Sequence, residues 1–187
     1  MQHRTRAVLG ATAAVALAAS ALAAPAAASN RPGDATIYDI ASSSADFTYL
    51  TAALEATGLD EALDGGGQFT VFAPTDAAFE KAADELAAAG VGDGTVPTLL
   101  AFLVQNDLAD DVLLYHVTDG RRTAKSVVNR NSDKSIETLL GASLTSTPSA
   151  TLVDASAATS DAKITATDIS ASNGVVHVID NVLVPLP

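Results

Sequence analysis

The chain contains no cysteine and no tryptophan, and only five Phe and three Tyr among its 187 residues. Without cysteine it cannot form a disulfide, a thiolate zinc site, a cysteine nucleophile or a lipid-modified N-terminal cysteine. With so few aromatic rings it offers no broad platform on which bases could stack. Because 48% of the residues are apolar, we predict a core of aliphatic and alanine side chains anchored by a few Phe and Tyr.

Positive charge is scarce as well. Ten Lys and Arg stand against 22 Asp and Glu, which gives a net charge of −12 and a pI near 4.3. A chain this acidic repels a phosphate backbone, so the charge argues against nucleic-acid binding. The length fits one ordinary domain with little left over, and no internal repeat is visible.

The one long uncharged apolar run lies at the N-terminus, where residues 7–22 follow the basic Arg4 and Arg6. Its length of about 16 residues is shorter than the roughly 20 that a membrane-spanning helix needs, and small residues at 26–28 resemble a cleavage site. We predict a secretory signal peptide at 1–28, a linker at 29–35 and one domain at 36–187. The alternative is an uncleaved anchor. Cleavage would leave a mature chain with a net charge of about −14 and no segment for membrane insertion.

Helical spacing dominates the first half of the remaining chain. Residues 36–63 predict two or three short helices, and the β-branched and aromatic run at 69–72 predicts a strand. Thr75 is a typical N-cap, and it predicts a helix over 76–88 with a carboxylate in its first turn. A further short helix is expected over about 99–113, with an extended segment at 114–117.

Short runs rich in Thr, Val, Ser and Ile dominate the second half, separated by turn residues. They predict strands of an antiparallel sheet at 124–128, 136–140, 143–147, 150–153, 163–167 and 175–184. Helices followed by strands indicate an α+β fold rather than a regularly alternating parallel one.

Three segments resemble the fasciclin-type domain family. Residues 70–79 are similar to its first signature, residues 173–183 to its second, and residues 114–117 to its Tyr-His segment. The order and spacing also fit, so the chain is identified as a single secreted bacterial member. The resemblance implies a wedge-like fold of two packed β-sheets flanked by short helices that are concentrated in the N-terminal half.

Most signature residues have a structural explanation. His177 lies in an apolar strand and needs a hydrogen-bond partner when buried, and Asp180 is expected to accept hydrogen bonds at a bend. We therefore expect His177→Ala to lower stability. The residues assigned to the structural signature are Thr70, Phe72, Pro74, Thr75, Asp76, Phe79, Gly174, His177 and Asp180.

The candidate partner-binding residues come from the same resemblance. The Tyr-His segment, here Tyr115 and His116, is implicated in integrin-dependent adhesion by members of the family, although structural anchoring is the alternative. An Asp-Ile pair precedes the second signature in those members, and Asp168 and Ile169 occupy that place. Ser170 stands where Leu or Met is common, so we do not assign integrin binding. An exposed Asp168 predicts that Asp168→Ala changes stability by no more than about 0.5 kcal/mol.

Half of all the basic residues lie within fourteen positions. They are Arg121, Arg122, Lys125, Arg130 and Lys134. This cluster is either a docking patch for an anionic wall polymer or partner, or it balances the charge of neighbouring acidic residues.

Catalytic and metal-binding patterns are missing. Asp107, Asp110 and Asp111 lack the spacing and the distal Glu of a calcium loop, so we predict no metal site and no cofactor. After signal cleavage two histidines remain, and neither accompanies a known nucleophile motif. We therefore assign no catalytic residues and predict that the protein is not an enzyme.

These patterns together predict an extracellular adhesion or matrix-association module. It would bind a protein or cell-surface polymer, with the cell wall as one location, and it would be a monomer. A small-ligand carrier is the alternative, using a cleft between helices and sheet lined by His116 or His177. A weak hydrolase would require a His within hydrogen-bond reach of a Ser and a carboxylate.

Overall fold

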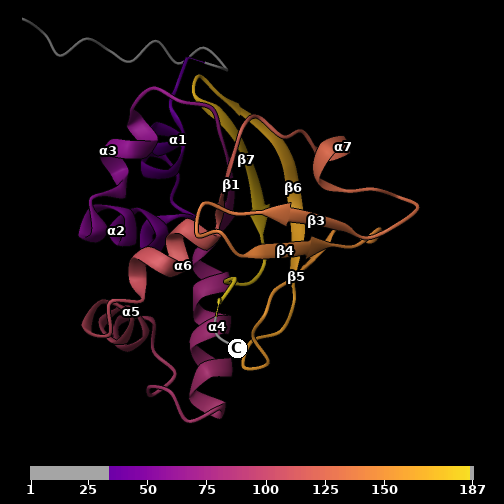
Figure 1. The fold of residues 1–187 in the computed structure, drawn as a ribbon. Coiled ribbons are helices and arrows are strands. Elements are labelled where there is room, and N and C mark those ends of the chain that lie inside the picture. Colours follow the sequence, from indigo (N-terminus) through magenta and orange to yellow (C-terminus); the bar gives the residue numbers. More distant parts are fainter. Residues whose placement is uncertain (1–33, 186–187) are drawn as a thin grey trace, which may run out of the picture.

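The computed structural model describes residues 34–185 (Figure 1). The predicted signal peptide at 1–28 and nearly all of the predicted linker lie outside the described residues. The described helices are α1 (Ile37–Ser43), α2 (Thr48–Thr57), α3 (Leu59–Asp64), α4 (Asp76–Ala88), α5 (Val96–Gln105), α6 (Ala109–Tyr115) and α7 (Ala124–Val127). The described strands are β1 (Phe69–Pro74), β2 (Val117–Asp119), β3 (Lys134–Glu137), β4 (Ser143–Ser146), β5 (Thr151–Val153), β6 (Ala162–Ala171) and β7 (Gly174–Ile179). Across these helices, none combines the length and apolar character needed to cross a membrane.

The first helices begin and end where local chemistry directs them. Thr36 and Asp39 form a capping box at the start of α1, with the Thr36 side chain accepting from the Asp39 N–H at 3.1 Å. Helix α2 ends at Gly58, whose φ of 73° is easily adopted by glycine. Three helices therefore fill the region where two or three were predicted.

Helix α4 follows its predicted boundaries. The Thr75 hydroxyl accepts a hydrogen bond from the Ala78 N–H at 3.2 Å and so caps the helix. Phe79 and Leu86 lie on its buried face. Asp76 does more than favour the helix dipole: its Oδ1 accepts from the Tyr49 N–H at 2.9 Å and caps α2, which has no side-chain cap of its own.

The strands form one continuous order, β2-β1-β7-β6-β5-β4-β3. All neighbours are antiparallel except β1 and β7, which run parallel. The long strand β6 pairs with β7 on one side and with β5 on the other, so it joins two halves of the sheet. In Figure 1, β3 and β4 cross the direction of β1, β7 and β6, as expected for two packed layers. The predicted α+β class is confirmed.

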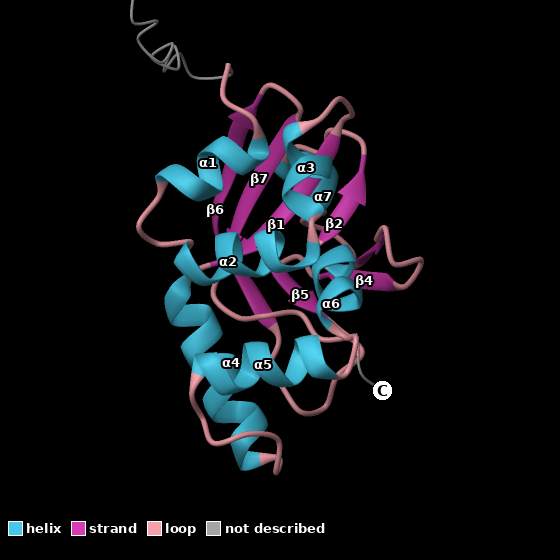
Figure 2. Ribbon diagram, turned by 90° about the vertical axis from the view of Figure 1, so that its left-hand side faces the viewer, coloured by secondary structure: helices cyan, strands magenta, loops and turns pink. Residues whose placement is uncertain are grey.

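Two cores lie on opposite sides of the central strands. One fills the space between sheet and helices and includes Leu50, Phe79 and Leu86. The other lies between the two halves of the sheet and includes Phe72 and Leu144. Figure 2 shows α1, α2 and α3 in front of one face of the sheet, with α4 and α5 below them. Every residue of β7 is buried because this strand contacts both cores.

The structure corrects three of the predicted elements. Residues 124–127 form the short helix α7 rather than a strand, and Tyr115 ends α6 rather than lying in an extended segment. Strand β7 ends at Ile179, not at 184. Beyond it the Leu183 and Val184 N–H groups donate to side chains, which draws the chain out of the sheet. These are tertiary contacts that local sequence patterns do not encode.

The turn between β6 and β7 fastens the helices to the sheet. Asn173 is buried, and its Oδ1 accepts from the Ile37 N–H at 2.9 Å while its Nδ2 donates to the Leu63 carbonyl. Its own carbonyl accepts from the Phe69 N–H at 3.0 Å. Gly174 follows it, packed so closely that a Cβ there would lie 2.1 Å from the Phe69 carbonyl oxygen.

We expect Gly174→Ala to lower the free energy of unfolding by about 3 kcal/mol or to prevent folding, because backbone atoms block the added methyl group. Thermal unfolding followed by circular dichroism measures the effect. Gly66→Ala is the matched control, since nothing lies within 4 Å of a Cβ at that position. Equal stability of the two variants would contradict the close approach of β7 to β1.

Candidate functional site

His177 is a buried neutral cross-link. Its Nε2 lies 2.9 Å from the Arg122 carbonyl, and its Nδ1 lies 3.3 Å from the Asp168 N–H. The first contact requires an N–H on Nε2 and the second a lone pair on Nδ1, so the ring is neutral. It also stacks on Phe72, with 5.8 Å between ring centroids. Burial lowers the pKa of His177, although the Arg122 carbonyl and the Asp168 charge oppose the shift.

A bulge in β6 explains why this cross-link exists. The register between β6 and β7 shifts between Ala166 and Ile169, which leaves the Asp168 N–H without a partner in the ladder. His177 on β7 accepts that N–H. It thereby ties the bulge to the loop that carries Arg122. Thr70 holds the same loop, accepting from the Arg122 N–H at 2.8 Å and donating to the Gly120 carbonyl at 2.7 Å.

His116 forms a second cross-link of the same kind. Its Nδ1 lies 2.6 Å from the Val112 carbonyl, and its Nε2 accepts from the Leu183 N–H at 3.0 Å. Here the proton sits on Nδ1, the opposite tautomer to His177. Burial lowers the pKa of His116 to about 4, even though the Val112 carbonyl favours the charged form. The ring therefore stays neutral at physiological pH.

The structure places the two residues of the Tyr-His segment in the interior. The side chain of Tyr115 is fully buried, with its hydroxyl near the Ser143 carbonyl, and burial raises its pKa. His116 is 2% exposed. Neither ring is available at the surface, which favours the structural alternative and corrects the expectation of direct partner contact.

Asp168 and Ile169 lie apart from that segment, on β6. Asp168 is exposed, but its Oδ1 accepts from the Ala124 N–H at 2.8 Å, at the start of α7. Its φ of 61° falls in the left-handed region, which Asp tolerates better than most residues. Ile169 is half-buried against the helix-side core. The predicted exposure of Asp168 is confirmed, but its carboxylate also caps α7.

The remaining signature residues hold backbone segments together. Asp180 accepts from the Lys163 N–H at 2.7 Å, and its own N–H donates to the Lys163 carbonyl at 3.1 Å. Phe72 and Pro74 lie in β1, directly beside β7 in register with His177 and Ile179.

A buried polar network surrounds Asn181, and the sequence did not predict it. Asn181 is fully buried and donates to Glu85 Oε2 at 3.1 Å and to Ser160. Glu85 in turn accepts from the Ser160 N–H at 2.8 Å. Burial alone would raise the pKa of Glu85, but the hydrogen bonds from Ser160 and Asn181 lower it. An Asn following an apolar strand was the one available signal, and it did not indicate the distant partner on α4.

The predicted basic cluster divides into two groups. Arg121 donates to the Ser170 hydroxyl at 2.6 Å and to the Ala171 carbonyl at 2.9 Å, and Arg122 donates to the Asp119 carbonyl at 3.2 Å. These two guanidinium groups brace the fold. Lys125, Arg130 and Lys134 instead line one open hollow.

This hollow, called the basic groove below, lies between α7, the loop 128–134 and the turn 148–150. Its volume is about 840 Å³. Asn129, Asn131, Ser149 and Thr167 add amide and hydroxyl groups to its lining, and Asp133 is the one acid among the lining residues. In the part of the chain that the structure describes, one side-chain ion pair occurs, Lys81–Glu85 at 3.9 Å. The cations of the groove thus form no ion pair with an acidic side chain of the described residues.

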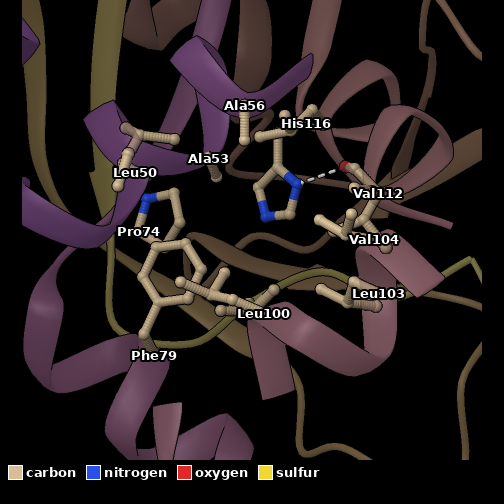
Figure 3. Close-up of a pocket in the computed structure, with 14 residues that line it drawn as sticks. Leu50, Ala53, Ala56, Pro74, Phe79, Leu100, Leu103, Val104, Val112 and His116 are labelled. Atoms are coloured by element: carbon tan, nitrogen blue, oxygen red, sulfur yellow. Dashed lines mark hydrogen bonds between the residues drawn. The ribbon is translucent and has the colours of Figure 1, made fainter. Parts of the chain in front are cut away.

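A smaller apolar pocket lies among α2, α5 and α6. Figure 3 shows the ring of His116 facing into it beside Ala56 and Val104. Its volume is about 60 Å³. Both His116 nitrogens are already hydrogen-bonded, so the lining offers no free polar group from this ring.

Residues 34–185 contain two histidines, His116 and His177, and 22 acidic side chains that could serve as catalytic groups or metal ligands. No group of three or more His, Cys, Asp or Glu side chains there could hold a metal ion. Each described histidine has both nitrogens bonded to backbone groups, so neither touches a Ser or a carboxylate.

Comparison with known proteins identifies relatives over most of the chain. The sequence model of one family, described as Fasciclin domain, matches residues 45–185. Protein sll1483 of Synechocystis is 38% identical over 151 residues, which cover 80% of this chain and 73% of that protein. Immunogenic protein MPB70 of Mycobacterium bovis is 32% identical over 150 residues, covering 78% of this chain and 66% of that protein.

Two further likenesses cover only part of the other protein. Transforming growth factor-beta-induced protein ig-h3 of Sus scrofa is 33% identical over 141 residues, which are 74% of this chain and 18% of that protein. A solved FAS1 domain pair from the insect cell adhesion molecule Fasciclin I superposes with a TM-score of 0.58 and 18% identity. That match covers 81% of this chain and 51% of the other, and it shows the fold alone.

We expect acid to destabilise the protein through His116. The unfolded chain takes up a proton near pH 6.5, whereas the folded one does so only near pH 4, so between these values the unfolded state binds more protons. The free energy of unfolding should fall across this window by on the order of 3 kcal/mol. His177 acts in the same direction because its pKa is also lowered.

Chemical denaturation at about pH 7 and about pH 4.5 measures this loss. His116→Gln serves as the comparison, because glutamine cannot titrate while the carboxylates remain the same. The wild type should lose more stability than the variant. Parallel losses would show that His116 does not remain neutral in the folded state.

We also expect His177→Ala to lower the free energy of unfolding by about 2 to 4 kcal/mol, since it removes a buried ring and two backbone hydrogen bonds.

Asp168→Ala should lower the free energy of unfolding by about 1 kcal/mol because it removes the cap of α7 and places alanine at positive φ. Asp168→Asn is the control, since an amide oxygen can still cap and Asn tolerates the same backbone conformation. If alanine and asparagine were equivalent at 168, the cap would carry no energy.

Proposed function

The chain belongs to the fasciclin domain family, and from this premise we propose that it is an exported adhesion module. It holds a protein or a cell-surface polymer through its surface and performs no chemistry on it. The predicted signal peptide supports export, and membership of the fasciclin domain family, whose members are typically adhesion-related extracellular modules, supports the adhesive class.

The basic groove is the single observation that carries this proposal. Its volume of about 840 Å³ lies in the range of ligand sites, and three cations without an acidic partner among the described residues line it. The surrounding domain is strongly acidic, so a cluster of free cations is unexpected unless it meets something negative. A surface of this kind suits binding rather than transformation.

The histidines support a role without catalysis. A general base needs a free lone pair within reach of a substrate proton, and the lone pairs of His116 and His177 already accept backbone N–H groups. Asp168 and Ile169, which are exposed and half-buried, stay candidates for partner contact that we do not place in the proposed site.

A small-ligand carrier is the weaker proposal. The apolar pocket does have His116 in its lining, as this alternative requires. Its volume of about 60 Å³ is far below the roughly 300 to 1,000 Å³ of sites that enclose a drug-sized molecule. Native mass spectrometry of protein purified from its own source tests this alternative, which predicts a retained ligand of defined mass.

We expect the mature protein to bind cell-wall material or matrix proteins more strongly than an unrelated monomeric protein of the same size and net charge. Co-sedimentation with washed cell-wall fractions measures the bound fraction, and immobilised matrix proteins provide the second surface. The charge-matched control removes attraction that depends on net charge alone. Equal binding of the two proteins on every surface would contradict the adhesive function.

A further inference from the structure

We propose that the basic groove binds an anionic polysaccharide, a chain of sugars carrying carboxylate or sulfate groups. This inference deepens the proposed function and rests on it, because it names the chemical class of the partner and the residues that hold it. Lys125, Arg130 and Lys134 would pair with the acidic groups, and the amides and hydroxyls of the lining would meet the sugar hydroxyls.

The distribution of charge points to an anion. Residues 34–185 contain seven Lys and Arg against 22 Asp and Glu, and three of those seven cations line this one hollow. Asp133 is the single carboxylate among the lining residues. Like charges gathered in one groove repel each other, so a bound anion stabilises the arrangement. Repulsion from the acidic remainder is weak beyond the Debye length of about 8 Å at physiological salt.

The cations are placed for an external partner. Lys125 and Arg130 are exposed, and within residues 34–185 their charged groups form neither an ion pair nor a hydrogen bond. Lys134 is half-buried and donates to the Ser126 carbonyl, which fixes its ammonium at the edge of the groove. Fixed and free donors together allow one anchored contact and two that adapt to the spacing of the ligand.

Hydrogen bonds within the segments that line the groove hold its shape without a ligand. The Asn131 N–H donates to Asn129 Oδ1 at 3.0 Å, and Asn129 Nδ2 donates to the Ser132 hydroxyl at 3.0 Å. On the facing turn, the hydroxyls of Thr147 and Ser149 lie 2.9 Å apart. A site that keeps its shape without the ligand loses less conformational entropy on binding.

The lining favours a polysaccharide over other polyanions. No aromatic side chain lines the groove, so it lacks both the stacking surfaces used for nucleic-acid bases and the aromatic pockets that anchor protein partners. The lining places positive charges beside amide and hydroxyl groups. This combination matches a ligand that carries both acidic groups and sugar hydroxyls.

Binding of the mature protein to polygalacturonate, which carries carboxylates, and to heparin, which adds sulfates, tests the inference. Neutral dextran and poly-L-glutamate separate sugar recognition from charge alone. We expect tight binding to at least one acidic polysaccharide and none to dextran. Affinity should fall at least about tenfold when salt rises from about 0.1 M to about 1 M, because the Debye length then shrinks from about 10 Å to about 3 Å.

Two double variants locate the site. Lys125→Gln with Arg130→Gln should weaken binding at least about tenfold, whereas Lys81→Gln with Lys163→Gln removes the same charge outside the groove lining and should change it less than about twofold. Asp133→Asn should strengthen binding, a gain that loss of folding cannot produce. Thermal unfolding of every variant establishes that each is folded.

Several results would overturn the inference. These are equal losses in the two double variants, poly-L-glutamate binding as tightly as the polysaccharides, or absence of polysaccharide binding at low salt. The proposed function fails separately. If the groove variant still binds cell-wall material like the wild type, adhesion stands and the groove is not its site; if the wild type binds polysaccharide but no cell-surface material, the site stands without the adhesive role.

Discussion

Strand β7 is buried along its whole length between two cores, and this burial constrains the rest of the domain. A polar side chain in such a strand must find partners inside the protein, because an unsatisfied buried group costs about 1 to 3 kcal/mol. His177 finds them in two backbone groups from separate segments. His116 does the same between α6 and the segment that follows β7. Both rings work only when neutral, since each needs one donor and one acceptor nitrogen.

These interior contacts position the segments that form the basic groove. His177 and Thr70 hold the loop through Arg122, and Asp168 caps the short helix that follows it. The basic groove begins at that helix, so its first cation is positioned by contacts that reach back to the central strand. In the proposed function, the signature residues act on binding indirectly, through the scaffold beneath the groove. Buried signature residues are therefore compatible with the proposed binding at the surface.

The sequence predicted what local chemistry decides. Thr75 as an N-cap predicted the boundaries of helix α4, and apolar spacing predicted two or three short helices before β1, where three occur. The predictions failed where contacts with residues distant in sequence determine the local structure. Residues 124–127 are helical, with Asp168 as the cap. The chain leaves the sheet after Ile179 because His116 and Asp154 accept hydrogen bonds from the N–H groups of Leu183 and Val184. At the candidate site, clustering along the chain revealed the cations of the groove. Only the fold could separate Lys125 and Arg130 from Arg121, whose guanidinium is occupied by Ser170.

The neutral histidine pair is most directly tested by nitrogen NMR of the imidazole rings in the folded mature protein. At about pH 5.5, below the ordinary histidine pKa of about 6.5, the His116 ring should remain neutral because its pKa is about 4. The His177 ring should be less protonated than a free imidazole because burial lowers its pKa. The proton should reside on Nδ1 in His116 and on Nε2 in His177, because those nitrogens face carbonyl oxygens. Two imidazolium signals at that pH, or the same tautomer in both rings, would contradict the account.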